Sequence, residues 1–179
     1  INLARLDIRQ ESSRHSQLIN EFLKKKYNKT YLNLNEKEKI KFLKSQIISK
    51  KNKINNFKFN NKENNEVWLT FKMLAKEPSE CLGAYVISMT TSASDILSVS
   101  FLQKEANIEN KLRVVPLFET LDDLVNAKDI METLFSQSWY RKLIKNNQEV
   151  MIGYSDSSKD AGKICANWHQ YKAQEEIVK

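Results

Sequence analysis

Short apolar segments alternate along the chain with longer segments of helical periodicity. The apolar segments either alternate with period two or are apolar on both faces, which predicts strands at residues 2–9, 82–89, 113–118 and 150–154. Between them, apolar residues recur three and four positions apart, which predicts helices at residues 16–26, 35–49, 66–75, 95–106, 121–135, 139–144 and 161–178. Strands that alternate with helices in this way predict a helix-rich α/β fold with a parallel sheet.

The order of the segments also predicts a larger architecture. Four β/α units are half of a (β/α)8 TIM-type barrel, so we expect residues 1–179 to form a single partial domain of such a barrel with inserted helices. Asn35 and Thr120 stand at predicted N-caps, each with acidic residues in the turn that follows. Residues 50–65 are polar and low in complexity, which predicts a surface loop.

The net charge of +7 does not by itself indicate a nucleic-acid partner. The positive excess lies in residues 24–62, where almost all of the cations are lysine. Specific nucleic-acid sites favour arginine and interleaved aromatic side chains. Drift in composition explains the lysine and asparagine content better, and we expect no nucleic-acid partner.

Cysteine content and hydropathy predict the cellular setting. The two cysteines, Cys81 and Cys165, lack the spacing of metal ligands, which predicts buried, unpaired thiols in a reducing compartment. No apolar run is long enough to span a membrane, and no signal peptide is visible. We therefore expect a cytoplasmic protein without membrane contacts.

Polar side chains follow each predicted strand. Residues 149–162, EVMIGYSDSSKDAG, pass from a strand into a polar loop that carries Asp156 and Lys159. Glu119 follows the third strand and Arg9 ends the first, and the carboxyl ends of parallel strands share one edge. Two acids, an arginine and a lysine suit a hard divalent cation beside an anionic substrate. Spacing alone equally allows a set of buried salt bridges. The first two tips also contain Gln10, Glu11, Arg14, His15, Ser88, Thr90 and Ser94.

Four sequence blocks resemble phosphoenolpyruvate carboxylase. They are LDIRQESSRH at residues 6–15, AYVISMTTSASDIL at 84–97, VVPLFETLDDL at 114–124 and VMIGYSDSSKDAGK at 150–163. The final segment, WHQYKAQEEIVK, also fits. The blocks are long, specific and in the family's order. The resemblance runs from end to end, and residues 24–65 are the most diverged part.

The resemblance implies a reaction and a role for each matching residue. Phosphoenolpyruvate and bicarbonate would give oxaloacetate and phosphate through carboxyphosphate and an enolate, as an anaplerotic supply to the tricarboxylic acid cycle. Glu119 and Asp156 match the family's ligands of Mg²⁺ or Mn²⁺. Arg9 matches a phosphate-binding arginine, and Lys159 matches a catalytic lysine suited to hold bicarbonate or carboxyphosphate. For the full-length protein, the resemblance implies an allosteric homotetramer.

The resemblance also implies that part of the active site lies outside these residues. The family's catalytic histidine belongs to a TAHPT-type block and its glycine- and arginine-rich loop to an FHGRGGSxGRGG-type block, and neither block occurs here. His15 is therefore rejected as a general base, and His169 is expected on a helix surface. We expect an internal fragment that is inactive alone. Two alternatives are another metal-dependent barrel enzyme acting on phosphoenolpyruvate or an enolate, and a non-catalytic binding protein derived from the barrel.

Overall fold

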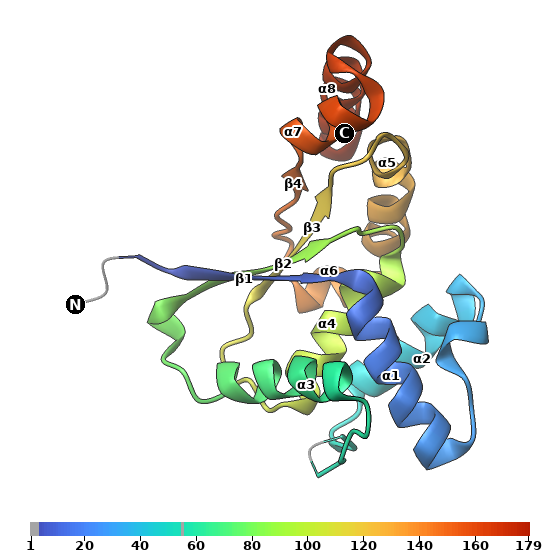
Figure 1. Ribbon diagram of the computed structural model, residues 1–179, viewed down its shortest axis with the longest axis vertical. Coiled ribbons are helices and arrows are strands. Elements are labelled where there is room, and N and C mark those ends of the chain that lie inside the picture. Colours follow the sequence, from blue (N-terminus) through green and yellow to red (C-terminus); the bar gives the residue numbers. More distant parts are fainter. Residues whose placement is uncertain (1–3, 55) are drawn as a thin grey trace.

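A four-stranded parallel sheet organises the chain, as the alternating pattern predicts (Figure 1). The computed structural model describes residues 4–54 and 56–179, so the start of the first predicted strand, Asn2 and Leu3, lies outside the described residues. Each strand pairs in parallel with the next one along the chain, and all carboxyl ends therefore meet at one edge. The strands are β1 Leu6–Glu11, β2 Leu82–Ser88, β3 Arg113–Phe118 and β4 Met151–Ile152.

Helices connect the strands in every crossover. In Figure 1, α1, α3 and α4 lie together on one side of β1 and β2, whereas α5, α7 and α8 lie at the β3–β4 end of the sheet. Helix α1 contacts α3 and α4, α2 contacts α4, and α5 contacts α8. The helices are α1 Ser12–Tyr27, α2 Glu36–Ile48, α3 Lys62–Leu74, α4 Ala93–Glu105, α5 Leu121–Phe135, α6 Ser138–Leu143, α7 Tyr154–Ala161 and α8 Lys163–Val178, with short 3-10 turns at Tyr31–Asn33 and Ser79–Cys81.

The central strands are apolar on both faces. Tyr85 and Ile87 of β2 belong to the main core beneath the helices. Ala84 and Val86 point the other way and join residues of β3 in a second, smaller apolar cluster. A strand that is buried on both faces needs apolar residues at nearly every position, which explains the nearly continuous apolar sequence of residues 82–89.

The polar tip predicted at residues 10–15 is not a loop. β1 continues through Glu11, and α1 begins at Ser12 without an intervening turn. Gln10 pairs with Ile87 and Glu11 with Ser88 in the parallel register. Tertiary strand pairing thus extends β1 into residues whose polarity indicated its end.

The loop predicted after the fourth strand is also wrong, because residues 154–161 form helix α7. Ser157 is fully buried, and its hydroxyl donates to the carbonyl oxygen of Gly153 at 2.6 Å. Gln170 of α8 donates to that same hydroxyl oxygen at 2.7 Å. Gly162, at φ 76°, separates α7 from α8 because glycine adopts this conformation without steric cost.

The segment predicted as a surface loop at residues 50–65 is anchored at two points. Ile54 and Phe59 are buried in the core, and α3 begins at Lys62, with Asn61 as its N-cap, rather than at Glu66. The carboxylate of the buried Glu105 accepts the backbone N–H of Ile54 at 2.7 Å. The polar composition therefore concealed both the apolar anchors and the first turn of α3, and Asn55 lies outside the described residues.

Candidate active site at the carboxyl edge of the sheet

Glu119 lies at the carboxyl end of β3 and receives donors from both preceding strands. The residue is 7% exposed. One carboxylate oxygen, Oε2, accepts from Nη2 of Arg9 on β1 at 3.0 Å. The other, Oε1, accepts from the backbone N–H of Met89, just beyond β2, at 3.3 Å. Groups from three successive strand ends therefore meet at one carboxylate.

Met89 is a participant that the sequence does not reveal. Its backbone has φ 53°, in the left-handed region that side-chain-bearing residues seldom adopt. Its carbonyl oxygen accepts the hydroxyl of Ser12 at 2.6 Å. No residue type marks such a peptide in advance, since the usual signal for positive φ is glycine.

The polar residues expected at the second tip support the backbone instead. The hydroxyl of the buried Thr90 donates to the carbonyl oxygen of Ile87 at 2.9 Å. Ser94 donates through its backbone N–H and its hydroxyl to the carboxylate of Glu36, each at 2.8 Å. These contacts fix the β2–α4 turn and the start of α4, and they do not reach Glu119.

Helix α7 is joined closely to the loop that carries Glu119. Gly153 donates its N–H to the carbonyl oxygen of Phe118 at 2.8 Å. A Cβ on Gly153 would lie 2.6 Å from Cβ of Glu119, so only glycine allows this approach. At the other end of α7, Asp160 accepts the backbone N–H of Leu121, the first residue of α5, at 2.8 Å.

Asp156 and Lys159 lie on α7 and not on a loop at the strand tip. The ammonium of Lys159 lies 3.4 Å from the Asp156 carboxylate, and these side chains are 77% and 51% exposed. An exposed pair at this spacing stabilises the helix only slightly. The structure thus groups the four predicted residues as two ion pairs, Arg9 with Glu119 and Lys159 with Asp156, at the carboxyl edge of the sheet.

The two histidines, His15 and His169, make hydrogen bonds that support the fold. His15 is fully buried, and its Nε2 hydrogen-bonds the hydroxyl of Tyr85 at 2.8 Å. Burial, and then the charge of Arg14, lower the pKa of His15 to about 3, so the ring is neutral near pH 7. His169 is partly buried on α8 and donates from Nδ1 to the carbonyl oxygen of Cys165 at 2.9 Å. Both cysteines are unpaired, as expected, but they are only partly buried and not buried as predicted.

The sequence matches the family model for phosphoenolpyruvate carboxylase over residues 1–179. The chain belongs to the phosphoenolpyruvate carboxylase family. It is 46% identical over 179 residues to phosphoenolpyruvate carboxylase of Flaveria pringlei, covering 100% of this chain and 18% of that protein. It is 48% identical over 177 residues to phosphoenolpyruvate carboxylase of Aliivibrio salmonicida, covering 99% and 20%. The chain thus spans about a fifth of the length of these curated relatives.

A phosphoenolpyruvate carboxylase implies a divalent metal, and the two carboxylates are chemically suited to one. Within residues 4–54 and 56–179, no three His, Cys, Asp or Glu side chains form a ready-made metal cage. Mg²⁺ does not require one, because it usually takes one or two carboxylates and fills its octahedron with water and substrate oxygens. Gly153 leaves space for the start of α7, which carries Asp156, to approach Glu119. In their donor chemistry, Glu119 and Asp156 are therefore suited to a hard cation.

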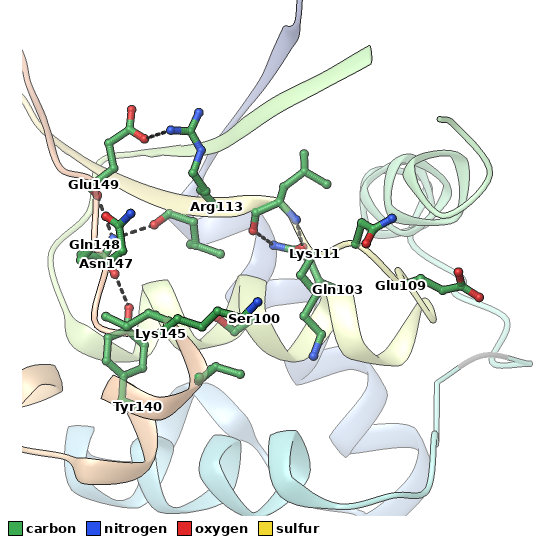
Figure 2. A pocket seen from close by; sticks show the side chains of 15 residues that line it. Ser100, Gln103, Glu109, Lys111, Arg113, Tyr140, Lys145, Asn147, Gln148 and Glu149 are labelled. Atoms are coloured by element: carbon green, nitrogen blue, oxygen red, sulfur yellow. Dashed lines mark hydrogen bonds and ion pairs between the residues drawn. The ribbon is translucent and has the colours of Figure 1, made fainter. Parts of the chain in front are cut away.

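A cavity of about 640 Å³ lies away from this edge, at the amino end of β3 (Figure 2). Several of its polar side chains pair with one another or with the backbone: Tyr140 donates to Gln148 at 2.6 Å, Gln148 donates to the Val114 carbonyl oxygen at 2.8 Å, and Arg113 pairs with Glu149. The strand ends, where charged groups of different strands converge, therefore remain the candidate site of this carboxylase-family chain. None of the helices in the described ranges combines the length and hydropathy that a membrane span requires.

Proposed function

We propose that the chain forms one wall of the active site of a phosphoenolpyruvate carboxylase, which makes oxaloacetate and phosphate from phosphoenolpyruvate and bicarbonate. The single observation that carries the proposal is that Arg9 of β1 and the Met89 N–H just beyond β2 each donate to one oxygen of Glu119, just beyond β3. This cluster lies at the edge where parallel α/β folds bind ligands. The family match over the whole chain supplies the substrate class.

The two-faced sheet supports a (β/α)8 barrel. Ala84 and Val86 of β2 and Val115 and Leu117 of β3 form an apolar cluster on the face away from the main core. Inward-facing layers of this kind fill the interior of TIM barrels. Among the described residues β1 and β4 each have one unpaired edge, and further strands on those edges would continue the curve of the sheet.

Arg9 is suited to the substrate phosphate. Within the described residues its guanidinium pairs through Nη2 alone, and its side chain is 56% exposed. The other N–H donors are available to phosphate oxygens, which the planar guanidinium fork matches well. Arg9 would therefore orient the phosphoryl group for attack by a bicarbonate oxygen, which displaces the enolate of pyruvate.

Lys159 is suited to the second anion. Its side chain is exposed, and its only charged partner in the described part of the chain is Asp156. An exposed ammonium at this position would hold bicarbonate and then carboxyphosphate, which releases carbon dioxide and phosphate. The enolate carbon adds to the carbon dioxide and completes oxaloacetate.

Glu119 and Asp156 would hold Mg²⁺ or Mn²⁺. When bound, the cation supplies Lewis-acid stabilisation of the negative charge on substrate oxygens. A direct measurement of metal binding distinguishes this role from that of a structural salt bridge between Arg9 and Glu119. The family resemblance extends the proposal to a cytoplasmic, allosterically controlled homotetramer.

The test uses the full-length protein that contains this segment. Oxaloacetate formation is followed by coupling to malate dehydrogenase, with and without bicarbonate, and Mn²⁺ affinity by electron paramagnetic resonance of the unbound ion. We expect Glu119→Gln and Asp156→Asn each to weaken Mn²⁺ binding at least about tenfold. Asp122→Asn, at an exposed acid in the first turn of α5, is the matched control.

The lysine role is tested separately. Lys159→Gln should lower kcat about 100-fold or more, as expected for loss of a group that stabilises developing negative charge. Because Lys159 is exposed, the melting temperature of the Lys159→Gln protein should equal that of the wild type. Lys163→Gln, at an exposed lysine on α8, is the matched control. Unchanged Mn²⁺ affinity in both carboxylate variants would remove the metal assignment, and bicarbonate-independent turnover would favour another enzyme of phosphoenolpyruvate.

A further inference from the structure

The peptide that follows β2 is held in an unfavourable conformation. Met89 has φ 53°, where its Cβ crowds the backbone. Such a conformation persists when surrounding contacts fix it, and it concentrates at functional sites. The hydrogen bonds of Met89 therefore indicate the role of this backbone conformation.

Both polar groups of Met89 have partners. Its N–H donates to Oε1 of Glu119 at 3.3 Å. Its carbonyl oxygen accepts the hydroxyl of Ser12 at 2.6 Å, and Ser12 is only 7% exposed. The serine on α1 and the carboxylate on β3 thus contact the same residue from opposite sides of its α-carbon.

The hydroxyl of Ser12 is not needed for starting its own helix. The N-cap of α1 is Glu11, and no side-chain hydrogen bond caps this end. The adjacent Ser13, also in the first turn, donates its hydroxyl to the carboxylate of Glu11 at 2.6 Å and not to Met89. The two neighbouring serines therefore differ in their hydrogen bonds. Ser13 bonds locally, whereas Ser12 bonds to the residue that follows β2.

We propose that Ser12 is a positioning residue for the metal-binding carboxylate of Glu119. By holding the Met89 carbonyl, Ser12 keeps the Met89 N–H aimed at Oε1 of Glu119, while Arg9 holds Oε2 at 3.0 Å. One donor on each oxygen fixes the plane of the carboxylate. Without the Met89 donor, the carboxylate turns towards Arg9 and presents its oxygens less favourably to a cation. The inference rests on the proposed role of Glu119 as a metal ligand.

The experiment measures Mn²⁺ affinity of the full-length protein by electron paramagnetic resonance, independently of turnover. Ser12→Ala should weaken Mn²⁺ binding about tenfold, the usual effect of losing an outer hydrogen-bond partner of a metal ligand. Ser12→Cys keeps the size of the side chain with a weaker donor, and should give an intermediate loss. Ser13→Ala, the matched control, should bind Mn²⁺ as the wild type does.

A second background separates positioning from general destabilisation. In Met89→Gly the left-handed conformation no longer carries a steric cost, so the peptide depends less on Ser12. Ser12→Ala should then weaken Mn²⁺ binding by less than about threefold relative to Met89→Gly alone, a coupling that a double-mutant cycle reports. An equal loss in both backgrounds would overturn the proposal.

The remaining outcomes are also decisive. Wild-type affinity in a folded Ser12→Ala protein would overturn the proposal. If Ser12→Ala does not fold, wild-type affinity in Ser12→Cys would do so. The proposed function fails separately if Glu119→Gln leaves Mn²⁺ affinity unchanged. If Glu119→Gln weakens binding and the Ser12 variants do not, the role of Ser12 alone is rejected.

Discussion

The contact between Gly153 and Glu119 gives the sharpest test of how the site is assembled. In Gly153→Ala the new Cβ would lie 2.6 Å from Cβ and 2.9 Å from Cα of Glu119, whereas ordinary contact begins at 3.4 Å. The two segments must therefore separate by about 0.8 Å. Gly153 has φ −85° and ψ 113°, which alanine adopts readily, so the effect is steric and not conformational.

The size of the effect follows from that displacement. Overpacking of this kind costs about 1–3 kcal/mol of stability. A misplacement of about 1 Å in a reacting group lowers the rate about 100-fold, equivalent to about 2.7 kcal/mol of transition-state stabilisation. We expect Gly153→Ala to lower kcat/KM for phosphoenolpyruvate about 10- to 100-fold and to weaken Mn²⁺ binding, both measured in the full-length protein.

Gly83→Ala is the matched control, because it is also a steric change beside a strand. A Cβ on Gly83 would clash with the Asp7 carboxylate, which accepts the Ala84 N–H at 2.6 Å. Loss of that hydrogen bond costs about 1 kcal/mol of stability. The bond lies at the amino end of β2, and the candidate site lies at the carboxyl end. Gly83→Ala should lower the melting temperature and leave Mn²⁺ affinity unchanged. A Gly153→Ala protein with kcat/KM within about twofold of wild type would refute the steric argument.

Two predictions concern stability. The pKa of His15 is about 3 in the folded state and 6.5 for an ordinary histidine, so the unfolded chain takes up the proton first. Stability is therefore unaffected by this group above pH 6.5 and falls as the pH drops from 6.5 towards 3, by about 1.4 kcal/mol per pH unit. His15→Gln should flatten the pH dependence of the urea midpoint between pH 8 and 5, roughly by this slope, and parallel curves for the two proteins would contradict it. Glu105→Ala leaves the partly buried N–H of Lys53 and the buried N–H of Ile54 without their acceptor, which should cost about 2–4 kcal/mol and speed tryptic cleavage near Lys53. Unchanged cleavage, compared with Glu109→Ala as a surface control, would count against this anchor.

Local signals predicted the elements whose stability is largely local. β3 and α5 begin and end where the sequence indicates. For α5 the reason is its capping box, in which Thr120 and Asp123 each accept the other's backbone N–H. The convergence of Arg9 and Glu119 was predicted equally well, because parallel strands in sequential order bring their carboxyl ends together.

Features that depend on tertiary contacts were not predicted. Helix α7 reads as a loop because serine, aspartate and glycine favour turns, and its helical state depends on the buried contacts of Ser157. The Met89 peptide has no sequence signal, since its conformation is set by Ser12 and Glu119 from distant parts of the chain. The pairing of Arg9 with Glu119 was therefore accessible from the sequence, whereas the backbone contacts around it were not.

The bond between Asp160 and the Leu121 N–H has a consequence for building chimeras within this family. Together with the Gly153 contact, it ties both ends of α7 to the β3–α5 connection that carries Glu119. If residues 117–123 alone were exchanged between homologues, they would face residues 153–160 of the other protein and not the segment with which they normally pack. Residues 117–123 and 153–160 should be inherited together as one unit of exchange, although about thirty residues of sequence separate them.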